Sequence, residues 1–535
     1  MTNQRSNMKQ CIQSGQASLG IELGSTRIKA VLIDNHSQTI AIGEHEWDSE
    51  YIDGNWTYSL ENVWVGLQSC YLDLKQKVKH EFGLVLSSIS SLGISAMMHG
   101  YLVFDDKGQQ LCAFRTWRNN YTLTSSQILT DAFNYPVPQR WSIAHLHNAI
   151  TNKEIHVQHV NFMTTLAGYV HWQLSGEKVL GVGDASGMFP IDIETGMFNQ
   201  AMCHTFDQLC SPHQLGWQVS SILPKPLSAG EDAGALSQQG ALLLDPEGDL
   251  RADIPMCPPE GDAGTGMVAT NSTHANTGNV SAGTSIFAMV VLDKPLKRVH
   301  PELDLVTTPD GKLVAMAHCN NCSSSIDAWV NMFKEVITIS GNSISTAELY
   351  RCLYEAALQG DPACEGYIAY GYTSGEHVTH FEQGRPLFAR KPDVPLTIAN
   401  FMRVNLQTAL GAVKIGMDIL ARDEGVVLEK MYGHGGLFKT PVVGQRLMAA
   451  ALNAPVVVKT TAGEGGAWGI AVLASYLQQY KNGIMLDDFL ADSVFIDDDE
   501  HTLDPVETDV EGFETFHQRY KSCLGIERAA VDLLP

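Results

Sequence analysis

The sequence has no apolar run that approaches the roughly 20 residues needed to cross a bilayer. Basic residues are also scarce, with 35 Lys and Arg against 59 Asp and Glu and a formal net charge of −24. A nucleic-acid partner requires a basic surface, so this balance argues against DNA or RNA as the main partner. The N-terminal stretch of residues 1–18 lacks the apolar core of a secretory signal, and we expect a cytoplasmic protein without membrane association.

The eleven cysteines are scattered, which favours a reducing compartment over a disulfide-stapled fold. One close pair exists, Cys319 and Cys322 in HCNNC. A second pair at matching spacing is missing, and this argues against a structural metal site.

What the chain does have is length and apolar content, with 535 residues of which 44% are hydrophobic. A chain of this size exceeds one ordinary core, so two large domains are expected. The acidic residues concentrate between Asp487 and Glu514, where twelve carboxylates occur without Lys or Arg. Such a run is usually a solvated surface, with partner binding as the alternative.

One short pattern occurs twice. GIELGSTRIKAVLID at 20–34 and GNVSAGTSIFAMVVLD at 278–293 both run from a strand through a glycine-hydroxyl turn into a second apolar strand. Gly24 superimposes on Gly283, and both copies end in Asp. The simplest interpretation is a tandem pair of similar domains at 18–270 and 271–480, with a flexible N-terminal tail at 1–17 and an acidic extension at 481–535.

Strand and helix patterns alternate between the two turns. A strand is predicted near 89–97, and amphipathic helices at 59–82, 161–175 and 343–359. This mixture is typical of the α/β class.

The turns suit phosphate, because glycine and short hydroxyl residues let backbone amides approach an anion closely. The predicted cradles are Gly24, Ser25 and Thr26 in the first copy, and Gly283, Thr284 and Ser285 in the second. An ordinary hairpin is the alternative for either copy alone, and the duplication favours phosphate binding.

Two later segments are rich in glycine but match no common nucleotide signature. GHGGLFKT at 433–440 has Phe438 where a Walker A loop needs glycine, and GEGGAWG at 463–469 has Trp468 where a dinucleotide fingerprint needs its third glycine. Both precede helical patterns, so they could hold a base or phosphate at a helix entry, or simply allow close packing.

Eight motifs follow one another along the chain: GIELGSTRIKAVLID, GISAMMHG, TWRNN, GDASGMFPID, EGDAGTGMVA, SAGTS, GHGGLFKTP and GEGGAWGIAVLA. In this order and combination they resemble the FGGY family of carbohydrate kinases, most closely the pentulose kinases (xylulokinase and ribulokinase). The resemblance implies two ribonuclease H-like domains of the actin and hexokinase superfamily with an interdomain cleft, and a sugar and ATP as ligands.

The resemblance assigns roles to individual residues. It implies that Asp262 is the base that deprotonates the acceptor hydroxyl and that Glu22, where the family usually carries Asp, holds Mg²⁺ directly or through water. Arg27 could add charge to the first turn, or be a surface residue. The adenosine wall is expected at Gly435 and Gly436, with Gly465 and Gly466 as weaker candidates.

The sugar-binding residues implied are His99, Trp117 and Asn119. His99 matches the family's histidine, although Ala96 and Met97 replace the usual Gly and Gln before it. Asn119 stands where many relatives carry Asp, so a charge is lost there. For Asp184 we expect a structural role.

The expected activity is therefore transfer of the γ-phosphate of ATP to a hydroxyl of a ketose, most simply a pentulose. Two alternatives stay open: a nucleotide-binding or ATP-hydrolysing regulatory protein on the same scaffold, and a kinase for a hexulose, polyol or sugar acid. A homodimer would be ordinary for this family.

Overall fold

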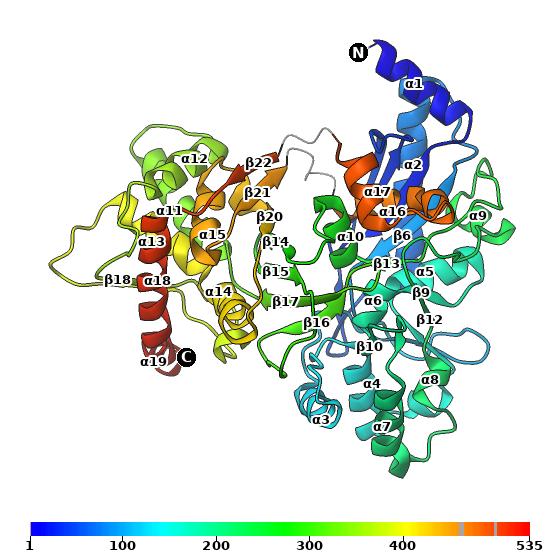
Figure 1. Ribbon diagram of the computed structural model, residues 1–535, viewed down its shortest axis with the longest axis horizontal. Helices are drawn as coiled ribbons and strands as arrows, with labels where there is room; N and C mark the ends of the chain where they lie inside the picture. The colour runs from blue at the N-terminus through cyan, green and yellow to red at the C-terminus, as the bar shows by residue number, and fades with distance from the viewer. Residues whose placement is uncertain (1, 460–464, 497–499, 535) are drawn as a thin grey trace. The chain divides into compact units, whose positions relative to one another are not determined.

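The computed structural model describes residues 2–459, 465–496 and 500–534, which belong to two compact units (Figure 1). The first unit comprises Met1–Thr273, Leu305–Val314 and Gly463–Asp497. The second comprises His274–Asp304, Ala315–Ala462 and Asp498–Pro535. Each unit combines a sheet with packed helices, as the α/β prediction requires.

The chain leaves the first unit at Thr273, close to the predicted boundary at 270. The difference lies in 465–480, which were predicted in the second domain but belong to the first unit as part of α16. The elements of the first unit are α1 (Thr2–Gln13), β1 (Ser18–Leu23), β2 (Arg27–Ile33), β3 (Thr39–Glu46), β4 (Glu50–Ile52), β5 (Asn55–Thr57), α2 (Leu60–Phe82), β6 (Ser91–Ala96), β7 (Leu102–Phe104), α3 (Leu123–Phe133), α4 (Ser142–Thr151), β8 (Phe162–Thr164), α5 (Leu166–Ser175), β9 (Val179–Gly181), α6 (Val182–Ser186), β10 (Ile191–Asp192), β11 (Met197–Phe198), α7 (Gln200–Cys210), α8 (Val219–Ile222), β12 (Lys225–Leu227), α9 (Gln238–Leu244), β13 (Glu260–Gly261), α10 (Asp262–Thr270), α16 (Gly465–Lys481) and α17 (Leu486–Phe489).

The first sheet has the strand order β13-β6-β1-β2-β3, with β1 antiparallel to β2 and parallel to β6. Side chains alternate across β1, so Leu19, Ile21 and Leu23 enter the core on the side of α2. Gly20 and Glu22 therefore lie on the other face, against α16, which Figure 1 shows in orange beside the blue strands.

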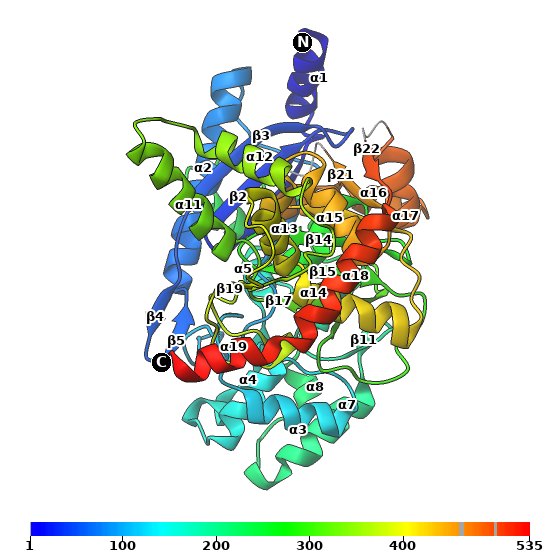
Figure 2. The same ribbon diagram turned by 90° about the vertical axis from the view of Figure 1, so that its left-hand side faces the viewer.

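Gly20 permits this close packing, because a Cβ there would lie 2.3 Å from the carbonyl oxygen of Ala467. On the opposite face, α2 packs along β3 (Figure 2). This helix begins after Ser59, whose side chain accepts a hydrogen bond from the amide of Asn62, and ends at Gly83 with a φ of 70°. The predicted helix at 59–82 is confirmed.

The second unit repeats the plan of a sheet with flanking helices. Its elements are β14 (Thr277–Ala282), β15 (Ile286–Val291), β17 (Leu313–Cys319), α11 (Ser324–Ile339), α12 (Thr346–Ala357), β18 (Tyr367–Tyr370), β19 (Leu387–Arg390), α13 (Ile398–Ala409), α14 (Gly411–Asp418), the π-helix Ile419–Glu424, β20 (Lys430–His434), α15 (Val443–Leu452), β21 (Val456–Lys459), β22 (Glu500–Leu503), α18 (Glu507–Ser522) and α19 (Leu524–Leu533); β16 (Asp304–Thr307) lies where the chain changes unit.

Within the second unit, the strands of the second sheet have the order β17-β15-β14-β20-β21-β22. Its hairpin β14–β15 repeats β1–β2, which confirms the duplication read from the sequence. The registers differ by one residue, since Leu23 pairs with Ile28 in the first hairpin and Ala282 pairs with Ile286 in the second. The second glycine-hydroxyl turn is thus one residue tighter.

Both chain ends differ from the prediction. The expected flexible tail at 1–17 forms α1, which buries Cys11 and Ile12 to 5% exposure. The expected acidic extension at 481–535 is divided between the units: α17 belongs to the first unit, whereas residues 500–534 belong to the second, in which β22 pairs with β21 and α18 packs on α13 and α15 (Figure 2). Its Phe513, Phe516 and Tyr520 are fully buried, because their helical spacing provides an apolar stripe that the acidic composition concealed.

Candidate active site

The first glycine-hydroxyl turn is fixed through its carbonyl groups. Trp47 Nε1 donates to Gly24 O at 2.7 Å, and Tyr58 Oη donates to Ser25 O at 2.5 Å. The amide of Trp47 donates to Thr26 O at 3.2 Å. Within the described residues, the amides of Ser25 and Thr26 form no hydrogen bond, so the turn keeps two donors for a ligand.

Two neighbouring side chains behave differently at this turn. Trp117 Nε1 donates to Ser25 Oγ at 3.2 Å, which brings the TWRNN segment to the turn. Arg27 instead forms ion pairs with Glu44 and Glu46 on β3, both at 3.1 Å. Its charge is therefore partly offset there, and a contribution to phosphate binding stays a prediction.

Glu22 lies at the N-terminus of α16. The Ala467 amide favours the charged form of its carboxyl, and a Cβ on Gly466 would lie only 2.2 Å from Glu22 Oε1. Burial, reinforced by the charge of Asp262, raises the pKa of Glu22 to about 7, and Lys29 and the Ala467 amide oppose this shift. A second acid thus lies near enough to repel Glu22.

Asp262 is the first residue of α10 and follows directly after β13. Its Oδ1 accepts a hydrogen bond from the amide of Met98 at 3.1 Å. The residue keeps contact with solvent, yet the protein around its carboxyl removes enough water to raise the pKa to about 6, against the effect of the surrounding amides. Such a group can accept a proton near neutral pH.

Behind Asp262 lies a pair of buried acids. Glu260 accepts hydrogen bonds from the amides of Gly183 and Asp184, at 3.2 and 2.9 Å. Asp184 accepts a hydrogen bond from Thr165 Oγ1 at 2.6 Å. Burial and mutual repulsion raise the pKa of Glu260 to about 8, and burial raises that of Asp184 to about 8. These contacts agree with the structural role predicted for Asp184.

The glycines of GDASG and its neighbours allow this packing. A Cβ on Gly181 or Gly183 would lie 2.2 or 2.5 Å from a Glu260 carboxylate oxygen, and one on Gly187 would lie 2.6 Å from His99 Nδ1. His99 Nδ1 lies 3.1 Å from the carbonyl oxygen of Gly187, and burial lowers the pKa of His99 to about 3. A neutral ring that donates through Nδ1 leaves Nε2 as an acceptor.

Asn119 is committed to the protein itself. Its Oδ1 accepts a hydrogen bond from the amide of Trp56 at 2.9 Å, and its Nδ2 donates to Trp56 O at 2.8 Å and Thr116 O at 3.1 Å. The amide therefore clamps the hairpin β4–β5 to the TWRNN segment. Sugar binding by Asn119 stays a prediction, and the internal contacts give this residue a structural task as well.

In the second unit, the turn Gly283–Ser285 is also held by its carbonyl groups. The amides of Cys322 and Ser323 donate to Thr284 O at 2.9 Å and Gly283 O at 3.1 Å. The Cys319 and Cys322 thiols are free and buried, and the described residues contain no group of three or more metal-ligating side chains.

The glycines expected at the adenosine wall divide between the units. Gly435 has a φ of +98°, and a Cβ there would lie 2.5 Å from Ala282 O, so the chain passes directly over the end of β14. Gly436 follows and begins a short 3₁₀ turn. Gly465 and Gly466 open α16 in the first unit, next to Glu22, while 463 and 464 lie outside the described residues.

Sequence reasoning missed Glu260, Trp47 and Tyr58. Glu260 stands two residues before Asp262 in PPEGDAG, and a second acid in that motif was the available signal. The two aromatic residues come from β3 and from the segment before α2, and only the folded contacts connect them with the turn.

Comparison with known proteins identifies the class. Residues 17–247 and 278–477 match the N-terminal and C-terminal domains of the FGGY family of carbohydrate kinases. The chain belongs to this family and is an ATP-dependent carbohydrate kinase that transfers phosphate to an alcohol group. The described residues include no helix with the length and apolar character of a membrane span.

Individual relatives differ in their named substrates. A xylulose kinase of Haemophilus influenzae is 20% identical over 516 residues, covering 94% of this chain and 98% of the relative. An autoinducer-2 kinase of Salmonella typhimurium is 21% identical over 316 residues, covering 56% of this chain and 55% of the relative. The structure of a xylulose kinase from Brucella ovis superimposes with a TM-score of 0.77 at 17% identity, covering 96% of this chain and all of that one. That of a gluconate kinase from Lactobacillus acidophilus reaches 0.77 at 15% identity, with 96% and 98% covered.

Proposed function

We propose that the chain transfers the γ-phosphate of Mg²⁺–ATP to a hydroxyl of a ketose, most simply a pentulose. The observation that carries the proposal is Asp262, an acid that reaches solvent, is oriented by the Met98 amide and has a pKa raised toward neutrality. Orientation and a pKa near the working pH are the two requirements of a general base. The end-to-end similarity to xylulose kinases supports the choice of a pentulose.

Glu22 fits the role of a Mg²⁺ ligand. Burial and the nearby charge of Asp262 raise the pKa of Glu22, and a bound cation would stabilise the charged form of the Glu22 carboxyl. Mg²⁺ favours oxygen ligands and is commonly held by one or two carboxylates together with waters and substrate phosphates. When bound, the ion would neutralise charge on the transferring phosphate. The Ala467 amide would keep Glu22 oriented while the rest of its carboxylate faces the ion.

The phosphates would be bound by the glycine-hydroxyl turns. The amides of Ser25 and Thr26 are available as donors because the carbonyl groups of the turn are already held. Thr284 is exposed on the second turn, whose carbonyl groups at Gly283 and Thr284 are likewise held by backbone amides. Backbone amides suit this task because they bind an anion without adding a flexible side chain.

For the sugar, we assign His99 and Trp117. The Nε2 atom of a neutral His99 would accept a hydrogen bond from a sugar hydroxyl, and the Trp117 ring, held through Ser25, would pack on the C–H face. The side-chain amide of Asn119 already forms hydrogen bonds with the backbone of Trp56, so fewer of its donors and acceptors would be left for the sugar. A hexulose, polyol or sugar acid is the alternative that these altered contacts keep open.

A panel of pentuloses, hexuloses, polyols and sugar acids in a coupled ADP assay tests the proposal. A pentulose should stimulate ADP release most. Asp262→Asn should lower kcat by about 10²- to 10⁴-fold and leave Mg²⁺–ADP binding close to wild type, whereas the exposed Asp131→Asn should change neither. Substantial transfer by Asp262→Asn would exclude Asp262 as the base.

ADP release that no member of the panel stimulates would contradict the proposed choice of a ketose substrate. A homodimer and a cytoplasmic location stay predictions, which sedimentation and fractionation of the native protein would test.

A further inference from the structure

The second glycine-hydroxyl turn depends on the loop 320–323, which leads into α11. Consecutive amides of this loop, from Cys322 and Ser323, donate to Thr284 O and Gly283 O at 2.9 and 3.1 Å. A displacement of the loop would therefore displace both carbonyl groups of the turn.

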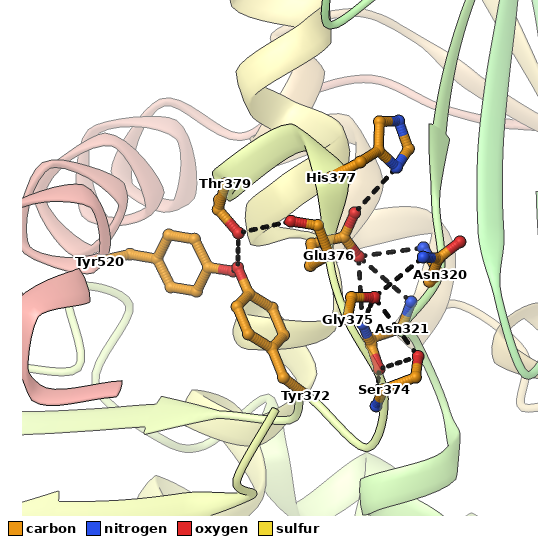
Figure 3. A network of polar contacts seen from close by, with 9 residues as sticks. All are labelled: Asn320, Asn321, Tyr372, Ser374, Gly375, Glu376, His377, Thr379 and Tyr520. Atoms are coloured by element: carbon orange, nitrogen blue, oxygen red, sulfur yellow. Dashed lines mark hydrogen bonds and ion pairs between the residues drawn. The ribbon is translucent and has the colours of Figure 1, made fainter. Parts of the chain in front are cut away.

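The first half of this loop is held by one buried carboxylate, Glu376 (Figure 3). Its Oε2 accepts hydrogen bonds from the amides of Asn320 and Asn321, at 2.9 and 3.3 Å, and from Asn321 Nδ2 at 3.2 Å. Glu376 is completely buried, and its Oε1 lies 3.6 Å from His377 Nδ1. One carboxylate oxygen thus gathers three donors of the loop.

Side chains of the loop 320–323 also form hydrogen bonds with the segment 373–376. Asn321 Oδ1 accepts hydrogen bonds from the amides of Thr373 and Ser374, at 2.9 and 3.1 Å, and Asn320 Nδ2 donates to Gly375 O at 2.8 Å. The two segments are therefore joined by both their backbones and their side chains.

On its far side, the Glu376 segment is connected to helix α18 through Thr379 and two tyrosine hydroxyl groups. Thr379 Oγ1 lies 3.4 Å from Glu376 O and 2.9 Å from Tyr372 Oη, which in turn lies 2.6 Å from Tyr520 Oη (Figure 3). Tyr520 is fully buried, and its carbonyl oxygen accepts a hydrogen bond from Tyr370 Oη at 2.6 Å. Polar contacts thus connect α18, through the Glu376 segment, with the loop 320–323 that donates hydrogen bonds to the turn Gly283–Ser285.

We infer that Glu376 is a positioning residue for nucleotide binding, which acts through the loop 320–323 on the turn Gly283–Ser285. The inference rests on the proposed function, because it assigns the turn to ATP phosphate. Glu376 need not touch the nucleotide, since a carboxylate would repel phosphate. Its effect is to fix the amides that precede those holding the turn.

Hydrogen-bond acceptance, rather than charge, is what this role needs. Burial raises the pKa of Glu376 to about 7, against the Asn321 side chain and the backbone amides that donate to it. A neutral acid or an amide oxygen still accepts from these donors, whereas alanine would leave buried donors unsatisfied. Glutamine should therefore restore what alanine removes.

The test compares Glu376→Ala, Glu376→Gln and the control Glu382→Ala, whose side chain is exposed six residues along the same segment. Mg²⁺–ADP binding is measured by calorimetry, KM for ATP and for the sugar by coupled assay, and folding by thermal melting. Glu376→Ala should weaken Mg²⁺–ADP binding by about tenfold and raise KM for ATP alike, with KM for the sugar nearly unchanged. Glu376→Gln should recover most of the affinity, and Glu382→Ala should match the wild type.

Wild-type nucleotide affinity in a folded Glu376→Ala variant would overturn the inference, as would equal losses in KM for ATP and for the sugar. If that variant does not fold, Glu376→Asp makes the same test, because it withdraws the carboxyl by one methylene and should also weaken Mg²⁺–ADP binding. The proposed function fails separately, if the wild-type protein itself binds no Mg²⁺–ADP.

Discussion

Replacing Gly466 with alanine tests whether the N-terminus of α16 positions Glu22. The new methyl group would lie 2.2 Å from Glu22 Oε1 and 2.7 Å from Thr265 Oγ1, and neither distance is tolerable between nonbonded atoms. Glu22 Oε1 and Thr265 Oγ1 are both side-chain atoms, which can move without a shift of the backbone. We therefore expect the Glu22 carboxyl to turn away and the helix to stay in place.

The cost in stability should be small. A displaced Glu22 loses the favourable interaction with the Ala467 amide, and losing a hydrogen bond of this kind costs about 2 kcal/mol at most. Gly466 is the second residue of α16, where the advantage of alanine over glycine is smaller than the roughly 1 kcal/mol of a helix interior. The free energy of unfolding should thus fall by about 1–2 kcal/mol, while loss of a metal-orienting contact should lower the apparent affinity for Mg²⁺ by about 10- to 100-fold.

The measurements are a Mg²⁺ titration of sugar-dependent ADP release and a urea titration of the same variant. Gly469→Ala is the contrasting substitution, because its methyl group would lie 2.1 Å from the backbone oxygen of Thr265 and should mainly lower stability. Gly525→Ala in α19 meets no atom within 4 Å and serves as the control. If Gly466→Ala requires the same Mg²⁺ concentration as the wild type for half-maximal ADP release, the proposed positioning of Glu22 is refuted.

Three other substitutions test separate parts of the molecule. Asp509→Ala leaves the guanidinium of Arg403 buried without its 2.7 Å partner and should lower the free energy of unfolding by about 3–5 kcal/mol; an unchanged urea midpoint would contradict this. Gly435→Ala, at a φ of +98°, should weaken Mg²⁺–ADP binding in calorimetry. Because the pKa values of Asp184 and Glu260 are raised to about 8, their stabilising effect is complete below about pH 4 and declines as pH rises to about 8. Asp184→Asn should flatten that decline in urea titrations, and a parallel profile would argue against it.

The features that sequence reasoning found are those with a local signal. Strand periodicity on both sides of a glycine-hydroxyl turn predicts each of the two hairpins, and both form as predicted. The family motif singles out Asp262, and the structure places it at the start of α10, while its role as the base stays a prediction. In these cases neighbours in the chain determine the geometry, so the pattern alone is informative.

The missed features depend on contacts between distant segments. Nothing near Trp47 or Tyr58 indicates that they hold the turn at Gly24–Thr26. The C-terminal acidic run concealed the apolar stripe of α18, because composition averages over faces that a helix separates. The contacts of Glu376 with the loop 320–323 likewise become visible only once 320–323 and 373–376 lie together.

The departure at position 22 shows how one distant contact can explain a local oddity. In the sequence, a glutamate replaces the family's shorter acid near the first turn, and a glycine pair opens a helix close to the other end of the chain. In the structure the two features are in contact, because the carboxyl of Glu22 lies near the Ala467 amide and occupies the space that a side chain at Gly466 would fill. An aspartate would reach less far toward that helix. If Glu22 and Gly466 are energetically coupled, Glu22→Asp and Gly466→Ala should lower the apparent affinity for Mg²⁺ to a similar degree. The double variant should then have an affinity little lower than that of either single variant.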